Sequence, residues 1–134
     1  MAPEVSPFTF PWAAGLHFSQ SVAEGDLVVA SGQAGFHADG TMAEGFEAQF
    51  RLALENLEAV LQAQGASLDS VLRLTTYLSN AADYATFKAV RENVLRPPYP
   101  ASTAVVGLVF PGMLVEVEAI APRGGPRTTS ALDV

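Results

Sequence analysis

The chain has 134 residues, of which 49% are hydrophobic and 16% charged, and its formal net charge is −7 with only seven Lys and Arg residues. This composition is typical of one compact domain and excludes nucleic-acid binding through clustered basic side chains. No apolar run is long enough to span a bilayer, and the first ten residues lack the features of a signal peptide. We therefore predict a cytoplasmic protein whose partners include neither a nucleic acid nor a membrane.

The residue types give little support for metal or cofactor chemistry. The absence of cysteine excludes disulfides, a thiolate nucleophile and cysteine-ligated metal. The two histidines, His17 and His37, lie on separate segments, and isolated histidines are more often surface or core residues than metal ligands. We predict no metal and no cofactor.

The first half of the chain predicts an arm, a hairpin and a helix. Residues 1–14 contain three prolines and no hydrophobic period, so they are predicted to be an arm outside the core. Two short strands are expected at about 16–23 and 27–33, around the turn Glu24-Gly25-Asp26. Between Ala43 and about Gln64, apolar residues recur every three or four positions and predict an amphipathic helix. Its inner stripe comprises Phe46, Phe50, Leu54, Leu57 and Leu61.

The second half predicts one strand, one helix and two final strands. "SVLRLTTYLS" is rich in β-branched and aromatic residues and is expected to be a central strand buried on both faces. Asp83 is suited to cap a second helix, which Pro97-Pro98 would end. The strands "STAVVGLVF" and "MLVEVEAIA" follow, and residues 123–134 are predicted to be a flexible tail.

The element order ββαβαββ predicts an α/β (α+β) domain over residues 15–122, with a mixed sheet and two helices on one face. The strands carry apolar residues on both faces, so the uncovered face needs a partner. We therefore expect a homo-oligomer with clefts where its subunits meet.

Six segments of the chain resemble the RidA/YjgF family. They are "HFSQSV", "VVASGQAG", "ALENLEAVLQAQGASLDSVLRLTTYL", "DYATFKAV", "PYPASTAVVGL" and "LVEVEAIAP", which together extend from about Leu16 to Pro122. The resemblance implies a chorismate-mutase-like fold and a homotrimer with three ligand clefts between subunits. It also implies an enzyme that hydrolyses reactive enamines and imines, releasing ammonia and a ketone without a cofactor or metal.

The catalytic residue implied by the resemblance is Glu116 of "VEVE", and Ser31 and Gly32 of "SGQ" also match the family. Phe18 stands where the family has a tyrosine and keeps the ring without the hydroxyl. We expect Phe18 to line the cleft and Trp12 to pack under the arm instead.

The family's cation for the substrate carboxylate is missing. Archetypal deaminases have an arginine after the Pro-Ala pair that corresponds to Pro100 and Ala101, whereas this chain continues with Ser102 and Thr103. Lys88 lies near a position that is asparagine in some relatives. The resemblance implies seven substrate-binding residues: Phe18, Ser31, Gly32, Lys88, Ala101, Ser102 and Thr103.

Two like charges, Glu116 and Glu118, point to the same face of an otherwise apolar strand. The preceding turn is one residue shorter than the family pattern, which leaves open which of the two is the pocket carboxylate. A carboxyl group in an apolar cleft beside a second carboxylate has a raised pKa, which suits proton transfer between water and a leaving amine. Alternatively, both glutamates are solvated, or paired with arginine across the trimer.

The missing arginine disfavours small 2-imino acids, because a hydrogen bond to a charged group contributes about 1.5–3 kcal/mol. Lys88, Arg73 or Arg96 could replace it if one of them reached the cleft. We predict an enzyme that acts on a less acidic enamine, imine or related unsaturated nitrogen compound. The alternative is a non-catalytic small-ligand-binding or chaperone-like trimer. Chorismate mutase activity is disfavoured, because that reaction needs several cations to hold a dicarboxylate.

Overall fold

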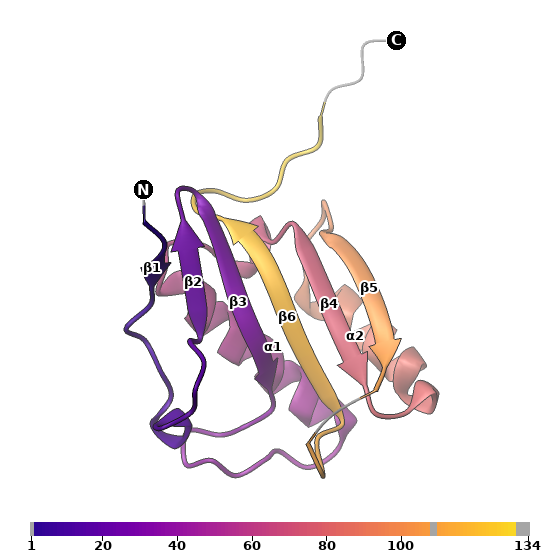
Figure 1. Ribbon diagram of the computed structural model, residues 1–134. Helices are drawn as coiled ribbons and strands as arrows, with labels where there is room; N and C mark the ends of the chain where they lie inside the picture. Colours follow the sequence, from indigo (N-terminus) through magenta and orange to yellow (C-terminus); the bar gives the residue numbers. More distant parts are fainter. Residues whose placement is uncertain (1, 108–109, 131–134) are drawn as a thin grey trace.

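A six-stranded mixed sheet forms the centre of the computed structural model, which describes residues 2–107 and 110–130 (Figure 1). The strand order is β1-β2-β3-β6-β4-β5, in which β4 and β5 are parallel and all other neighbours antiparallel. The strands are β1 (Glu4–Val5), β2 (Ser21–Glu24), β3 (Leu27–Ala34), β4 (Arg73–Leu78), β5 (Ala101–Val106) and β6 (Val115–Pro122). Leu108 and Val109 of the predicted strand "STAVVGLVF" lie outside the described residues.

Two helices, α1 (Phe46–Gln62) and α2 (Tyr84–Val94), cover one face of this sheet (Figure 1). The predicted fold class and the order ββαβαββ are therefore confirmed, with β1 as an additional strand. The described residues also form three short 3-10 turns: η1 (Pro11–Ala13), η2 (Leu68–Ser70) and η3 (Ala81–Asp83).

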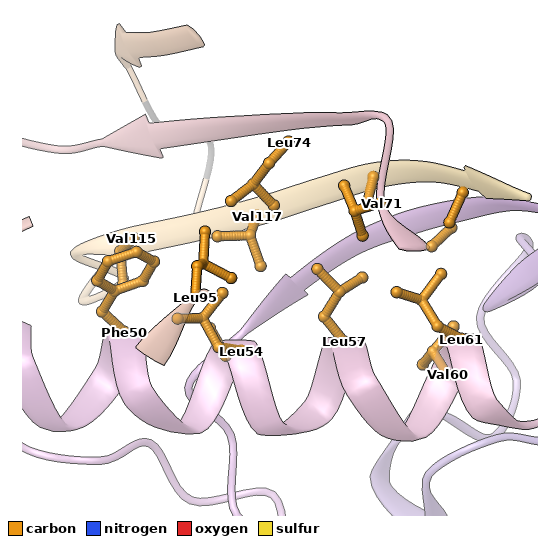
Figure 2. Close-up of a cluster of buried hydrophobic side chains, with 14 of the residues drawn as sticks. Phe50, Leu54, Leu57, Val60, Leu61, Val71, Leu74, Leu95, Val115 and Val117 are labelled. Carbon is orange, nitrogen blue, oxygen red and sulfur yellow. The ribbon is translucent and has the colours of Figure 1, made fainter. Parts of the chain in front are cut away.

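The core lies between α1 and the sheet, as Figure 2 shows. The apolar stripe read from the sequence is the buried face of this helix, and Phe50, Leu57 and Leu61 are each 0% exposed. The helix begins three residues later than predicted, because Gly45 has a φ of 85° and is not helical. Val115 and Val117 of β6 pack against the helix from the sheet side.

The opposite face of the sheet is uncovered within one chain. Along β4 and β6 buried residues alternate with exposed or partly exposed ones, so the prediction that β4 is buried on both faces was wrong for the single chain. Both helices lie on the other face, which leaves this one without a second layer. Leu27 and Val29 of β3 are 41% and 48% exposed here.

The N-terminal segment is attached to the domain, because β1 pairs with β2, and Phe8 and Phe10 pack against the core. At the other end, Arg127 donates hydrogen bonds to backbone oxygens including those of Leu68 and Pro98. Asp83 precedes α2 as predicted, but its side chain makes no capping hydrogen bond.

Candidate active site

A cleft of about 410 Å³ opens beside β3 and β6 at the end of the sheet where the loops after β3 and before β6 meet. Its walls come from the N-terminal segment, β3, the two loops and β6. The lining residues are Trp12, Leu16, Phe18, Gly32, Ala34, Phe36, Gly40, Phe110, Met113 and Glu116. Among those that the structure describes, Glu116 is the only one with an ionisable side chain.

Glu116 lies directly against the backbone of β3 at Gly32. A Cβ atom placed on Gly32 would stand 2.3 Å from Oε1 of Glu116 and 2.8 Å from its Cδ, far inside van der Waals contact. Gly32 is not among the glycines with positive φ, so the conformation itself does not require glycine here. The close approach of the Glu116 carboxyl group is the physical reason for glycine at this position.

A β-bulge in β3 produces this approach. Ala30 of β3 pairs with Ala119 of β6, whereas Gln33 pairs with Val117. The strand β3 thus advances three residues where β6 advances two. Ser31 and Gly32 form the extra length, and such bulges change the direction of neighbouring side chains. Beyond the bulge, Ala34 pairs with Glu116, and both line the cleft.

Hydrogen bonds fix the bulge to the segment before β2. The Ser31 hydroxyl donates to the carbonyl oxygen of Ser19 at 2.6 Å, and the Ser31 N–H donates to the carbonyl oxygen of Gln20 at 2.9 Å. The buried Gln33 side chain donates to Oε1 of Gln20 at 2.7 Å. Ser31 therefore positions the segment before β2, which carries Phe18 into the cleft wall, and its hydroxyl proton is already engaged.

The surroundings of Glu116 favour its protonated form. Burial in the cleft raises the pKa of this carboxyl group, and the negative charge of Glu118 on the same face raises it further. A carboxyl group with a raised pKa can give a proton to a basic nitrogen and, once ionised, take one from water.

Glu118 occupies a different place. It lines a separate hollow on the uncovered sheet face together with Arg73 and Thr75, and it accepts a short hydrogen bond from the Tyr77 hydroxyl. That bond is the main cause of the raised pKa of Tyr77. The structure thus places Glu116 in the cleft, whereas Glu118 is held outside it.

Two buried amide side chains on α1 hold the loops that form the cleft. Asn56 donates to the carbonyl oxygens of Ala34 and Phe36, at 2.9 and 3.0 Å. Gln49 accepts a hydrogen bond from the N–H of Leu114 at 2.8 Å. Both amides were missed from the sequence, although polar residues inside the apolar stripe of a helix were the available signal.

Trp12 lines the cleft, which corrects the prediction that it packs elsewhere. It stacks on Phe10 with ring centroids 5.6 Å apart and meets Phe36 at 4.7 Å, and Phe36 in turn meets Phe110 at 6.0 Å. The sequence signal was the alternation of aromatic residues at positions 8, 10 and 12, within a segment that was interpreted as an arm.

The predicted site residues form two groups in the structure. Phe18, Gly32 and Glu116 line the cleft together, with Ser31 just behind its wall. The others lie outside the cleft of their own chain: Lys88 is exposed on α2, 4.0 Å from Glu92, whereas Ala101, Ser102 and Thr103 lie on the edge strand β5.

Ser102 has a cation beside it. Nη1 of Arg91 donates to its hydroxyl oxygen at 3.1 Å, and the same guanidinium stacks on Phe87. Both line a hollow of about 260 Å³ between α2 and β5. The cations considered from the sequence lie elsewhere: Arg73 is in the hollow of Glu118, and Arg96 is an exposed partner of Asp69 at 4.0 Å.

Within residues 2–107 and 110–130, no three His, Asp or Glu side chains are grouped in a way that could hold a metal ion. Over the same described ranges, no helix is long and apolar enough to cross a membrane.

Comparison with known protein families gives a match over most of the chain. The family described as "Endoribonuclease L-PSP" matches residues 11–122. The RutC family protein YjgH of Escherichia coli is 34% identical over 106 residues, which cover 78% of this chain and 81% of its own. A Salmonella typhimurium protein named 2-iminobutanoate/2-iminopropanoate deaminase is 32% identical over 111 residues, covering 79% of this chain and 87% of its own.

Solved structures agree with these sequence matches. The crystal structure of RidA from an Antarctic Psychrobacter has a TM-score of 0.77 at 37% identity and covers 82% of this chain and 91% of its own. The structure of YjgH has a TM-score of 0.74 at 30% identity, covering 92% and 95% of the two chains.

Proposed function

Because the chain belongs to the RidA/YjgF family, we propose that it hydrolyses a reactive imine or enamine, with Glu116 as the acid–base group. The observation that supports this most directly is the position of Glu116 as the one ionisable side chain among the described residues of the cleft wall, with its pKa raised by burial.

In the proposed reaction, protonated Glu116 first gives its proton to the imine nitrogen. The resulting carboxylate then takes a proton from a water molecule as the water oxygen attacks the imine carbon. Glu116 returns this proton to the nitrogen as the carbon–nitrogen bond breaks and ammonia leaves. The Glu116 carboxylate then takes the remaining hydroxyl proton, which gives the carbonyl product and restores the protonated acid. Water supplies the oxygen, so no oxidant, metal or cofactor is needed for balance.

We propose that the substrate is not a small 2-imino acid. No cation lines the cleft of its own chain among the residues described, and a substrate carboxylate beside Glu116 would meet charge repulsion. The relatives named as deaminases of 2-iminobutanoate and 2-iminopropanoate therefore indicate the reaction type for this chain more closely than its substrate.

We also propose a homotrimer whose subunits pack through the uncovered sheet face. The exposed apolar residues Leu27, Val29 and Val105 lie on this face, and burying them between subunits is favourable. In such an assembly the edge strand β5 and α2 of a neighbour would complete the cleft. Ala101, Ser102 and Thr103 are then proposed to contact substrate from the neighbouring subunit, whereas Lys88, which faces Glu92, is not part of this proposal.

Ammonia release from freshly generated imines tests the proposed function. Carboxylate-free imines can be made from primary amines by a flavin-dependent amine oxidase, and 2-imino acids by an amino-acid oxidase. Wild type should accelerate hydrolysis of the first class more than the second, and Glu116→Gln should lose at least about 100-fold in rate. Equal rates for wild type and Glu116→Gln would refute the acid–base role and favour a ligand-binding protein.

A gain-of-function variant tests the missing cation separately. Ser102→Arg alone would place a second guanidinium beside Arg91, so it should be combined with Arg91→Ser. The double variant is expected to gain 2-imino acid hydrolysis relative to wild type. If wild type already matches an archetypal RidA protein on these substrates, a neighbouring subunit supplies the cation and the proposal for the substrate is wrong.

A further inference from the structure

One side of the cleft is a continuous row of aromatic rings. Phe10, Trp12, Phe36 and Phe110 follow one another with centroid separations of 5.6, 4.7 and 6.0 Å, and all but Phe10 line the cleft. Phe18, which is 56% exposed, adds a further ring to the wall. Aromatic faces of this kind favour flat apolar ligands, and a volume of about 410 Å³ is in the range that holds small organic ligands.

Aromatic rings have a negative electrostatic potential over their faces, so a ring face that is open to the cleft attracts a cation. The carboxyl group of Glu116 adds a site for a full ionic hydrogen bond at the side of the cleft where β3 and β6 meet. Arg73 lies on the same sheet face as Glu116 but in the separate hollow of Glu118, whereas Lys88 and Arg91 are directed at Glu92 and Ser102 on the α2 side; none of the three lines the cleft of its own chain. A positively charged ligand thus gains from the rings and the carboxylate together, and an anion gains from neither.

We propose that the cleft recognises a planar, positively charged carbon–nitrogen group carried on an aromatic ring, that is, a protonated aryl imine without a carboxylate. This inference rests on the proposed function and names its substrate class. The ring packs along Trp12, Phe36 and Phe110, and the C=NH₂⁺ group pairs with the carboxylate of Glu116. An imine that enters neutral receives its proton from Glu116 in the first step, and the iminium and carboxylate that result form the ion pair that the cleft recognises.

Three stable compounds of the same shape and different charge test this inference without turnover. Benzamidinium carries a planar cationic carbon–nitrogen group, benzamide is its neutral counterpart and benzoate its anionic one. Trp12 is the only tryptophan of the chain, so its fluorescence reports directly on the cleft, and isothermal titration calorimetry provides a second measurement. At a pH that ionises Glu116, benzamidinium should bind at least about tenfold more tightly than benzamide, and benzoate most weakly.

Glu116→Gln keeps the shape of the side chain and removes its charge. In this variant the affinities for benzamidinium and benzamide should differ by less than about threefold. Glu55→Gln is the matched control, because it makes the same change of net charge on an exposed residue of α1 and should keep the wild-type ranking. The ranking measured on the wild-type protein decides the inference even if Glu116→Gln does not fold.

Two outcomes would overturn the inference. Binding of benzoate as tight as that of benzamidinium would show that the assembled protein presents a cation to the ligand and selects a carboxylate. If no probe binds at millimolar concentration, the aromatic walls do not form a ring-binding site. Neither outcome bears on the role of Glu116 in catalysis, which the ammonia assay decides by itself.

Discussion

The close approach of Glu116 to Gly32 predicts that adding one methyl group, in Gly32→Ala, lowers activity strongly and changes stability little. In Gly32→Ala, the new Cβ would lie 2.3 Å from Oε1 of Glu116, whereas ordinary van der Waals contact begins at 3.4 Å. The carboxyl group must therefore move by about 1 Å, which a flexible side chain can do by rotating away from β3. A displacement of this size at a catalytic group costs roughly 100-fold in rate.

The fold should tolerate the same change. Gly32 does not have a positive φ, so alanine can adopt its backbone conformation. Alanine also lowers the conformational entropy of the unfolded chain, which offsets part of any strain in the folded state. We expect the free energy of unfolding to change by less than about 1 kcal/mol. Urea unfolding gives this value, and ammonia release from the best imine substrate gives the rate.

Two other glycines provide matched controls. A Cβ on Gly35 would lie 2.5 Å from the backbone Cα of Gln49, and because α1 cannot move away, Gly35→Ala should destabilise the fold by about 1–3 kcal/mol. A Cβ on Gly125 meets nothing within 4 Å, so Gly125→Ala should change neither property. If Gly32→Ala keeps wild-type activity, or loses as much stability as Gly35→Ala, the inferred position of Glu116 is wrong.

Three further predictions concern the site and its frame. The pKa of Glu116 is raised above its ordinary value of 4.5, so the folded protein holds more protons than the unfolded chain between that value and the raised one. Wild-type stability should therefore fall as the pH rises through this window, and urea unfolding of Glu116→Gln should lack this fall. Asn56→Ala leaves the carbonyl oxygens of Ala34 and Phe36 without their donor and should cost about 2 kcal/mol in urea unfolding, whereas an unchanged midpoint would show that water replaces the amide. Val29→Asp puts a charge on the uncovered sheet face, where the side chain is 48% exposed, and should dissociate the proposed trimer in analytical ultracentrifugation without unfolding the subunit; a trimer that persists would mean that another surface holds it together.

The secondary structure was predictable because its signals are local. The three- and four-residue spacing of Phe50, Leu54 and Leu57 identified α1, and the alternation along β6 identified a strand with two different faces. The start of α1 was predicted too early, because the conformation of Gly45 depends on how the loop before it enters the domain. For β4, the apolar composition did not show that one face stays open in the single chain.

The site was only partly predictable, because its parts come from distant segments. Resemblance located Phe18, Gly32 and Glu116, which the structure brings into one cleft. The bulge that aims β3 at Glu116 has no sequence signature beyond one glycine, and Trp12 reaches the cleft through packing that no local pattern encodes. The proximity of Arg91 to Ser102 depends on how α2 lies across β5, which spacing along the chain does not fix.

The two amide side chains on α1 hold the backbone of the cleft loops, whereas other side chains line the cleft. Gln49 and Asn56 hold the chain before β6 and after β3 through backbone groups, so the separation of these two loops is determined by one helix and not by the side chains that face the ligand. Trp12, Phe36 and Met113 can then be exchanged for smaller or more polar residues while the distance between the two walls stays the same. The ligand selectivity of this protein can therefore be redesigned, or diverge between relatives, through substitutions of the lining residues alone. The helix α1 keeps the two loops in place while the lining changes.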